Sequence, residues 1–297
     1  MIDPNLLRKF WERHADALES EIKTFSLGSL TFEDRAYQMG VINLSRDSPY
    51  RESVCLSVEQ ALYRGRRMQL EGASLVDVGA ESSVEATRIV GAEEQQSLLL
   101  PVVDALVGAG VPVSVETYHL DVADAVLDRG ACVINLTGRM EDDHLYRAIA
   151  RHGAGVIICY MAGRTVRDEV ELPTRDALVE RQLAYFREQL ELALNAGVER
   201  IWIDPGFGFS NRLPDGPARV AYQIESMLQA FRFRVLGWPT CVQLASPLAM
   251  FREEIRCAET CFATLAMLSK ANLLRTHESA RVQPVIAALS PMTVPSE

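Results

Sequence analysis

The segment Ile201-Trp-Ile-Asp-Pro-Gly-Phe-Gly-Phe209 has the form of a short apolar strand that ends on a carboxylate and breaks into a glycine turn. A carboxylate at the carboxyl end of a buried parallel strand is where α/β folds place ligand-binding chemistry. Asp204 can accept hydrogen bonds from a flat, amide-like heterocycle, and Phe207 or Phe209 offers an apolar face to such a ring. The segment therefore predicts an α/β protein that binds a ring-shaped ligand at the end of this strand.

Strand-like apolar runs alternate with segments of helical periodicity from Tyr37 onward, and eight strands are predicted. The predicted strands cover residues 37–43, 74–79, 112–116, 131–136, 154–160, 200–204, 239–244 and 272–276. The predicted helices cover residues 56–71, 92–108, 120–129, 142–151, 175–196, 217–233, 252–269 and 279–289. This alternation predicts an α/β fold of the (β/α)8 TIM barrel type, whose site lies at the carboxyl ends of the strands.

Two segments flank the predicted barrel, which spans residues 37–290. Residues 1–36 form an N-terminal extension, in which 5–21 predict an amphipathic helix and 24–32 predict a hairpin. We expect this extension to plug the amino-terminal end of the barrel and to have no chemical role. The tail 291–297 is expected to be frayed.

The composition excludes several classes of protein. With 48% hydrophobic and 24% charged residues, the 297-residue chain is expected to form one large globular domain. Its formal net charge of −10 argues against nucleic acid as a general partner. No run reaches the roughly 18 apolar residues of a membrane span, and the first twenty residues are too charged for a signal peptide, so no membrane partner and a cytoplasmic location are expected. Six cysteines without paired metal-type spacing predict reduced, mostly buried thiols.

Polar side chains stand at the carboxyl ends of the predicted strands. In chain order they are Asn43, Asp77 with Glu81, Glu116, Asn135, Tyr160, Asp204, Gln243, and Arg275 with His277. An unpaired buried polar group costs about 1–3 kcal/mol, so a ring of such groups indicates a polar ligand. Asp77 could instead hold the turn after its strand, and Asn135 alone could equally be structural. The combination of Glu116, Asn135 and Asp204 from three strands favours a ligand site.

Six motifs, in this order and spacing, resemble those of the dihydropteroate synthase family of pterin-binding barrel enzymes. They are Met39-Gly-Val-Ile-Asn43, Gly72-Ala-Ser-Leu-Val-Asp-Val-Gly-Ala-Glu-Ser82, Ser114-Val-Glu-Thr-Tyr118, Val133-Ile-Asn135, Asp204-Pro-Gly-Phe-Gly-Phe209 and Arg275-Thr-His277. The resemblance extends over residues 37–289. It implies a transferase of folate-type biosynthesis that joins a 6-hydroxymethyl-dihydropterin diphosphate to p-aminobenzoate or a related amine, with loss of diphosphate.

The resemblance places the pterin among side chains of three strands. The family's aspartate after the third strand, asparagine after the fourth and aspartate of the Asp-Pro-Gly motif correspond to Glu116, Asn135 and Asp204. Carboxylates accept hydrogen bonds from the N–H edge of a pterin, and an amide both donates and accepts. Glu116 is longer than the family's aspartate by a methylene, which implies a different depth or tilt of the ring. Phe209 corresponds to the aromatic side chain that packs near the ring, with ordinary core packing as the alternative.

The resemblance places the diphosphate at Asn43, Arg275 and His277, which are therefore the candidate catalytic residues. Arginine presents a planar fork to phosphate oxygens, and histidine adds a second donor. A salt bridge from Arg275 to Glu278 or another carboxylate is the alternative. Asn43 is also the candidate metal residue, because the resemblance implies Mg²⁺ bound mainly through the substrate diphosphate. Family habit further implies a homodimer, formed through the last helices.

The chain departs from the family pattern in the two loops nearest the expected ligand. Ala245-Ser246-Pro247 stands where the family has Ser-Arg-Lys, so the lysine that contacts the pterin is missing. The nearest downstream lysine, Lys270, lies past a predicted helix. Val84 stands where the second loop of the family, with its Thr-Arg pair, has a phosphate-facing arginine, and Arg88 is a candidate substitute.

The first loop and the segment after the fifth strand also depart from the family. Residues 45–50 read Ser-Arg-Asp-Ser-Pro-Tyr, which keeps the Asp-Ser pair but shifts the proline and loses the phenylalanine. Tyr160-Met161 stands where the family has Met-His. The residues expected near the second substrate are Asp47, Ser48, Ser82, Ser83 and Arg88.

Two alternatives to the synthase reaction stay open at the level of the sequence. A methyltetrahydrofolate-type pterin-dependent methyltransferase has no leaving diphosphate to neutralise, so the missing lysine and arginine favour it, whereas Arg275 and His277 disfavour it. A non-catalytic pterin-binding paralogue is the other alternative. A phosphate-sugar barrel enzyme is disfavoured, because no glycine-rich phosphate loop follows the seventh and eighth strands.

Overall fold

Strands and helices alternate in the order predicted from the sequence. The computed structural model describes residues 4–46, 50–81, 88–161, 174–207, 216–244 and 248–291. The barrel strands are β3 (Tyr37–Asn43), β4 (Leu75–Gly79), β5 (Val113–Glu116), β6 (Val133–Leu136), β7 (Gly155–Cys159), β8 (Ile201–Asp204), β9 (Cys241–Gln243) and β10 (Leu273–Thr276). The main helices that follow them are α3 (Val58–Leu70), α4 (Ala92–Gly108), α5 (Leu120–Asp128), α6 (His144–Arg151), α7 (Arg175–Asn195), α8 (Pro217–Met227), α10 (Ile255–Leu268) and α11 (Ser279–Leu289).

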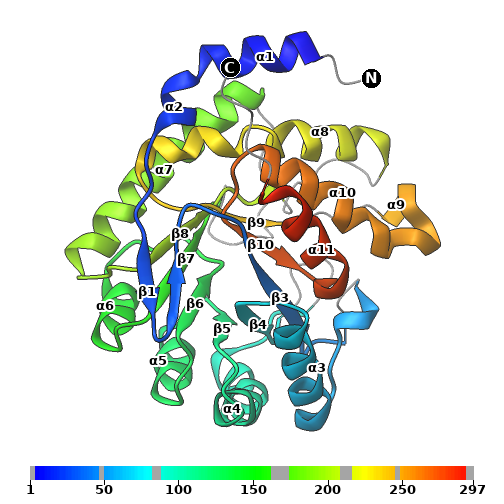
Figure 1. Ribbon diagram of the computed structural model, residues 1–297. Coiled ribbons are helices and arrows are strands. Elements are labelled where there is room, and N and C mark those ends of the chain that lie inside the picture. Colours follow the sequence, from blue (N-terminus) through cyan, green and yellow to red (C-terminus); the bar gives the residue numbers. More distant parts are fainter. Residues whose placement is uncertain are drawn as a thin grey trace.

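The strands form a nearly closed parallel barrel with the helices on its outer side (Figure 1). Their hydrogen-bonded order is β8-β7-β6-β5-β4-β3-β10-β9, and neighbours in that order pair over three to five residues. Among the described residues, β8 meets the β9 side at one parallel bridge between Ile203 and Thr240, beside a 3.0 Å bond from the Ile203 N–H to the Pro239 carbonyl. The predicted TIM barrel is therefore confirmed, with a seam between β8 and β9.

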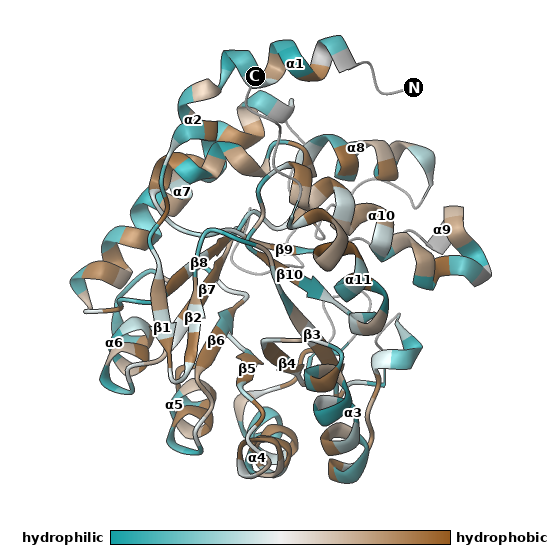
Figure 2. Ribbon diagram, in the orientation of Figure 1, coloured by the Kyte–Doolittle hydropathy of each residue, from teal (hydrophilic) through white to brown (hydrophobic). Residues whose placement is uncertain are grey.

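Strand alternation gives the barrel wall two faces with different partners, because successive side chains point to opposite sides. The outward-facing residues are buried against the helices, and the strand ribbons are mostly brown in Figure 2. Inward-facing residues near the amino-terminal ends, including Leu75 and Trp202, form a separate apolar cluster inside the barrel. Two residues further along the same strands, Asp77 and Asp204 share the inward face. Polar groups are therefore stacked above an apolar layer in the barrel interior.

The N-terminal extension packs against this inward apolar cluster. Its elements are α1 (Pro4–Arg13), α2 (Ala15–Glu19), β1 (Phe25–Leu27) and β2 (Leu30–Phe32). The two strands pair antiparallel, as predicted for a hairpin. Phe25 and Phe32 meet Trp202 edge-on, with ring centroids 4.7 and 4.9 Å from the indole. The expected single helix is divided at His14, whose φ of −121° and ψ of 35° lie outside the helical region.

Two predicted helices are interrupted. The segment 217–233 continues after α8 as a 3-10 helix (Ala230–Leu236), in which Arg234 is buried and paired with an acidic residue of the extension, Asp34, at 2.7 Å. The segment 252–269 starts with a 3-10 helix (Arg252–Glu254) and is α-helical only from the start of α10, because Arg252 has a φ of 46°, which a right-handed α-helix does not allow. A short helix α9 (Leu248–Phe251) precedes that break.

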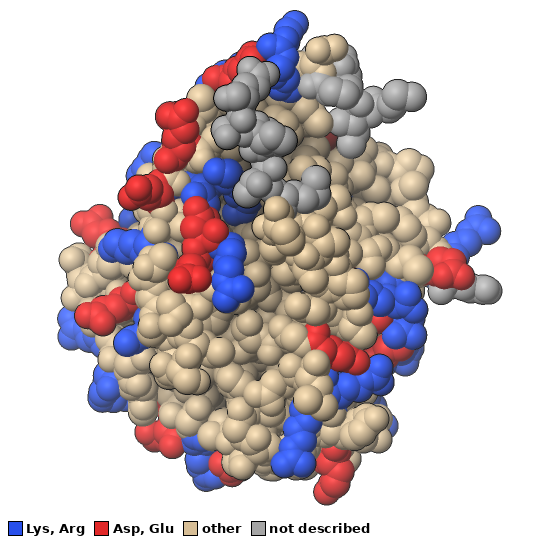
Figure 3. Space-filling view, viewed as in Figure 1, with Lys and Arg blue, Asp and Glu red and all other residues tan. Residues whose placement is uncertain are grey.

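Charges of both signs lie mainly around the rim of the face that Figure 3 shows, and a broad area of other residues occupies its centre. Within the described part of the chain, no helix has the length and apolar character that crossing a membrane requires.

Replacing Trp202 by alanine is expected to lower the free energy of unfolding by about 3–5 kcal/mol, because the change empties the contact between the barrel interior and the hairpin. Urea denaturation measures this value. Tyr63→Ala is the matched control, since Tyr63 is 70% exposed on α3 and its removal is expected to cost less than about 0.5 kcal/mol. A loss below about 1 kcal/mol for Trp202→Ala would show that the hairpin is not coupled to the barrel core.

Candidate active site

Asp77 is the centre of the polar layer inside the barrel. Its buried carboxylate accepts a hydrogen bond from the Ser114 hydroxyl on Oδ1 at 2.7 Å. On Oδ2 it accepts from the Asn135 amide at 3.0 Å and from Nε of Arg275 at 2.7 Å. These donors come from β5, β6 and β10, so Asp77 on β4 orients side chains of three other strands. The alternative considered from the sequence, a structural role for Asp77, fits this arrangement.

Arg275 extends into the barrel and lies between two carboxylates. Its Nε and Nη2 bond Asp77 and Glu116, the latter at 2.6 Å, and its Nη1 donates to Gln243 Oε1 at 2.9 Å. Burial alone would lower the pKa of Arg275, but the charges of Asp77 and Glu116 outweigh burial and raise it above its usual value. The salt bridge considered as an alternative for Arg275 is therefore present, with these carboxylates as partners.

Asn135 has one amide atom bonded and one unpaired. Because an ionised carboxylate can only accept, the bond to Asp77 assigns the donating nitrogen Nδ2 to that side of the amide. The oxygen Oδ1 is buried and has no hydrogen-bond partner among the described residues. A buried acceptor without a donor costs about 1–3 kcal/mol, and such an atom in a native structure indicates a ligand or an ordered water.

Asp204 and Glu116 are carboxylates whose charge is not fixed at neutral pH. Burial raises the pKa of Asp204 to about 6, although Asp204 accepts a 2.8 Å bond from the N–H of Gly206. Burial also raises the pKa of Glu116 to about 7, although the neighbouring charge of Arg275 opposes the rise. Donors of a bound ring would favour the ionised form of both groups and compensate for their burial.

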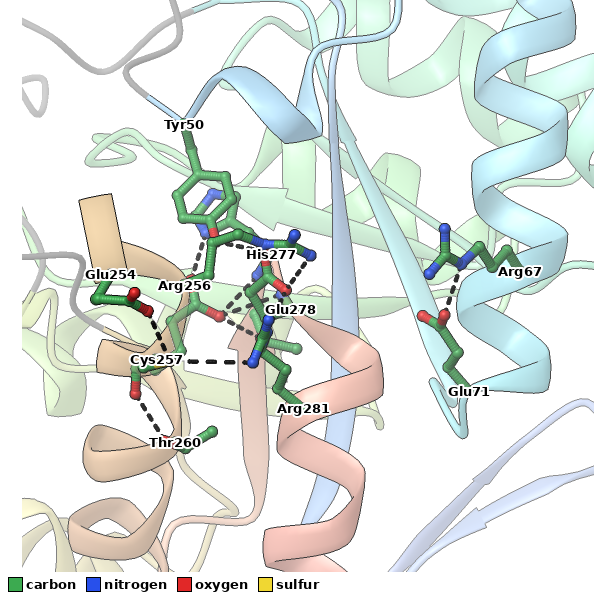
Figure 4. Close-up of polar contacts among 12 residues, drawn as sticks. Tyr50, Arg67, Glu71, Glu254, Arg256, Cys257, Thr260, His277, Glu278 and Arg281 are labelled. Carbon is green, nitrogen blue, oxygen red and sulfur yellow. Dashed lines mark hydrogen bonds and ion pairs between the residues drawn. The ribbon is translucent and has the colours of Figure 1, made fainter. Parts of the chain in front are cut away.

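A second group of polar contacts lies at the ends of β3 and β10. The Asn43 amide donates to Ser53 Oγ at 2.5 Å. The Nδ1 atom of His277 lies 2.7 Å from Glu259 Oε1, and the ring stacks on Tyr50 with centroids 4.4 Å apart and planes 12° apart. Figure 4 shows Tyr50 and His277 together with the ion pairs around them.

The structure thus divides the three residues predicted to bind the diphosphate. The guanidinium of Arg275 lies with Glu116 and the Asp77 network. Asn43 and His277 instead contact the turn that contains Tyr50. The spacing Arg275-Thr-His277 predicts neighbouring side chains, but the two point to different partners because Arg275 continues the inward face of β10 while His277 follows the strand's end.

The predicted loop residues are only partly covered by the structure. Arg88 lies on the surface in an ion pair with Glu94. Phe207, at the start of the glycine turn, is buried in the outer core. The predicted site residues that lie outside the described residues are Asp47, Ser48, Ser82, Ser83 and Phe209, together with the departures at Val84 and Ala245-Ser246-Pro247. Among the described residues, no group of three or more His, Cys, Asp or Glu side chains could hold a metal ion.

Sequence reasoning did not assign Tyr50 and Glu259 to the site, and it named Gln243 only as one of the polar side chains at strand ends. Gln243 stands at a strand end, which was the signal for its neighbours. Glu259 carries a different signal: it is a fully buried acidic residue on the apolar face of α10, a place where charged side chains occur only when paired. Tyr50 has no local signal, because the contacts of its side chain are with residues more than two hundred positions away in the chain.

Residues 39–277 match a protein family described as "Pterin binding enzyme". Curated relatives of the chain are dihydropteroate synthases. The enzyme of Streptococcus pyogenes serotype M3 (strain ATCC BAA-595 / MGAS315) is 28% identical over 276 residues, which cover 89% of this chain and 98% of the relative. That of Bacillus subtilis (strain 168) is 29% identical over 194 residues, which cover 64% of this chain and 65% of the relative.

Solved structures of the same kind of enzyme have a similar fold. Dihydropteroate synthase from Thermus thermophilus in complex with 4-aminobenzoate has a TM-score of 0.74 and 26% identity, and the match covers 91% of this chain and 100% of that chain. The structure of that enzyme in complex with 6HMPPP has a TM-score of 0.71 and 25% identity, over 91% of this chain and 98% of that chain.

Stability is expected to fall as the pH rises through the carboxylate titration. Because the folded pKa of Glu116 lies above its unfolded value of 4.5, the folded state binds more protons at intermediate pH. The contribution of Glu116 to the free energy of unfolding is therefore fully present below its unfolded pKa of 4.5. It is lost as the pH rises through its folded pKa of about 7. Urea denaturation at about pH 5 and about pH 7 should show a loss that is about 1–2 kcal/mol smaller in Glu116→Gln than in the wild type. Identical losses in the two proteins would contradict the titration of Glu116.

Proposed function

The chain belongs to the pterin-binding enzyme family, and from that premise we propose that it catalyses the dihydropteroate synthase reaction. The substrates are a 6-hydroxymethyl-dihydropterin diphosphate and p-aminobenzoate or a related amine. The reaction breaks the bond from the pterin methylene carbon to the diphosphate and forms a bond from that carbon to the amine nitrogen, which loses a proton. The relatives named dihydropteroate synthase and the Thermus thermophilus complexes with 4-aminobenzoate and 6HMPPP support this substrate pair.

The observation that carries the proposal is the unpaired acceptor of Asn135 beside two carboxylates whose pKa is raised. A pterin edge presents several N–H donors on one side of a flat ring. Asn135 Oδ1, Asp204 and the second oxygen of Glu116 would accept from that edge. Glu116 uses only Oε2 for Arg275, and Oε1 has no hydrogen-bond partner among the described residues.

The diphosphate would lie toward Asn43 and His277, at the ends of β3 and β10. Donors held in place there stabilise the charge that builds up on the leaving oxygen without having to reorganise. Arg275 lies two residues before His277 in the chain, but its guanidinium is paired with Asp77 and Glu116, so it would act on the ring side of the ligand.

Magnesium is proposed as a companion of the diphosphate. The ion prefers oxygen ligands and usually keeps several waters and phosphate oxygens. The side-chain oxygen of Asn43 is the protein ligand that the resemblance implies for the ion. The ion would neutralise diphosphate charge when bound.

Two further features of the protein are proposed on the strength of the resemblance and the sequence. The first is a homodimer formed through the last helices, which sedimentation velocity would detect. The second is a cytoplasmic location.

Incubation with the pterin diphosphate, p-aminobenzoate and magnesium is expected to yield a pteroate product. Asn135→Ala is expected to lower kcat/KM by about tenfold or more, because one hydrogen bond to the ring and the packing of its neighbours are lost. Product formation is followed by chromatography.

Asn195→Ala is the matched control, since Asn195 is exposed at the end of α7 and should leave the rate unchanged. The proposal fails if the wild type, at high enzyme concentration, forms no product while it binds a methylated reduced folate tightly. That result would favour a methyltransferase.

A further inference from the structure

The turn that follows the first barrel strand contacts both residues at the proposed diphosphate position. Ser53 Oγ accepts from Asn43 and donates to the backbone oxygen of Tyr50 at 2.7 Å. The ring of Tyr50 stacks nearly parallel on His277. One segment, Tyr50 to Ser53, therefore touches a side chain of β3 on one side and the residue after β10 on the other.

His277 is also held along its edge by a buried carboxylate. Glu259 on α10 accepts from the His277 backbone N–H at 2.9 Å and from the hydroxyl of Thr276. With Nδ1 of the ring 2.7 Å from the same carboxylate, the hydrogen lies on Nδ1, because an ionised carboxylate only accepts. Among the described residues nothing bonds the other ring nitrogen, Nε2, which is therefore the atom presented to a ligand.

Tyr50 is anchored at its hydroxyl as well as through its ring. The hydroxyl donates to Glu278 Oε1 at 2.5 Å, and the side chain is 4% exposed. Glu278 is in turn bonded by Arg256 at 2.6 and 2.9 Å and lies 3.3 Å from Arg281, as Figure 4 shows. Burial, followed by the bond to Glu278, raises the pKa of Tyr50, so the hydroxyl keeps its proton and remains a donor.

Arg64 on α3 ties the same two segments together through the backbone. Its Nη1 donates to the carbonyl of Glu52 at 2.7 Å, and its Nη2 donates to the carbonyl of His277 at 3.0 Å. Arg64 therefore connects the turn to the residues after β10. Stacking, the hydroxyl bond and the Arg64 bridge act on the same pair of segments.

We propose that Tyr50 is a positioning residue of a diphosphate subsite. Its ring fixes the plane of the His277 ring, while Glu259 fixes the tautomer and rotation of that ring. The backbone oxygen of Tyr50 orients Asn43 through Ser53. The inference rests on the proposed function and deepens it by assigning the residues that orient the diphosphate donors. Donors held in one geometry lose less conformational entropy on binding an anion, so the gain appears as affinity for the diphosphate. The pterin residues on β5, β6 and β8 have no part in these contacts.

Calorimetry with two separate probes tests this assignment. Inorganic pyrophosphate with magnesium reports on the diphosphate subsite, and 6-hydroxymethylpterin without phosphate reports on the ring site. Tyr50→Ala is expected to weaken pyrophosphate binding by about tenfold, which corresponds to about 1.4 kcal/mol. It should leave the Kd of the pterin within about twofold.

Two further variants separate positioning from folding. Tyr50→Phe keeps the stack and removes only the bond to Glu278, so it should weaken pyrophosphate binding by less than about threefold. Tyr63→Ala, an exposed tyrosine on α3, should change neither Kd. The ¹⁵N shifts of His277 should report the Nδ1–H tautomer in the wild type and a mixture of tautomers in Glu259→Gln.

The inference is overturned if Tyr50→Ala binds pyrophosphate like the wild type. It is equally overturned if Tyr50→Ala weakens both probes together, because that result means general loss of structure. Failure of the proposed function gives a different pattern: the wild type binds pyrophosphate in a Tyr50-dependent way but forms no pteroate and binds no pterin. That pattern would support the positioning role of Tyr50 at an anion subsite and would contradict the proposal that the protein binds a pterin.

Discussion

The buried ion pair between Asp77 and Arg275 is the interaction on which the polar interior of the barrel depends. An ionised carboxylate at this depth would cost several kcal/mol without a partner. Arg275 supplies that partner and extends the network to Glu116 and Gln243, so β4, β5, β9 and β10 share one set of contacts. The network still holds more acidic than basic groups once Asp204 is counted. A ring rich in N–H donors is the kind of ligand that such an interior would accept.

The polar network can exist because an apolar layer lies directly beneath it. Near their amino-terminal ends the strands direct large side chains such as Leu75 and Trp202 into the barrel. The hairpin residues Phe25 and Phe32 cover that layer. The buried polar groups above this layer therefore have apolar side chains beneath them. In such low-dielectric surroundings a hydrogen bond is electrostatically stronger than in water.

The fold and half of the candidate site could be predicted from the sequence, because both depend on local patterns. Strand periodicity specifies which residues face inward, and the carboxyl end of each strand lies near the mouth of the barrel. The positions of Glu116 and Asp204 as last residues, and of Asn135 as the last but one, follow from these local patterns. The direction of a long flexible side chain is not local. The Arg275 side chain could reach partners on several sides. It pairs with Asp77 because the carboxylate of Asp77 is buried, and that burial exists only in the assembled barrel. The stack of Tyr50 on His277 likewise depends on tertiary packing.

The seam between β8 and β9 is joined by one parallel bridge among the described residues, whereas the other neighbouring strands pair over three to five residues. Local opening requires less free energy where few backbone hydrogen bonds hold neighbouring strands. Asp204 ends one strand of the seam and Gln243 ends the other, so the two polar groups sit on separate edges of the same gap. A molecule held by Asp204 and by the network reached through Gln243 would span the gap and slow its opening. A ligand bound in the barrel interior would then slow the hydrogen exchange of backbone amides in β8 and β9.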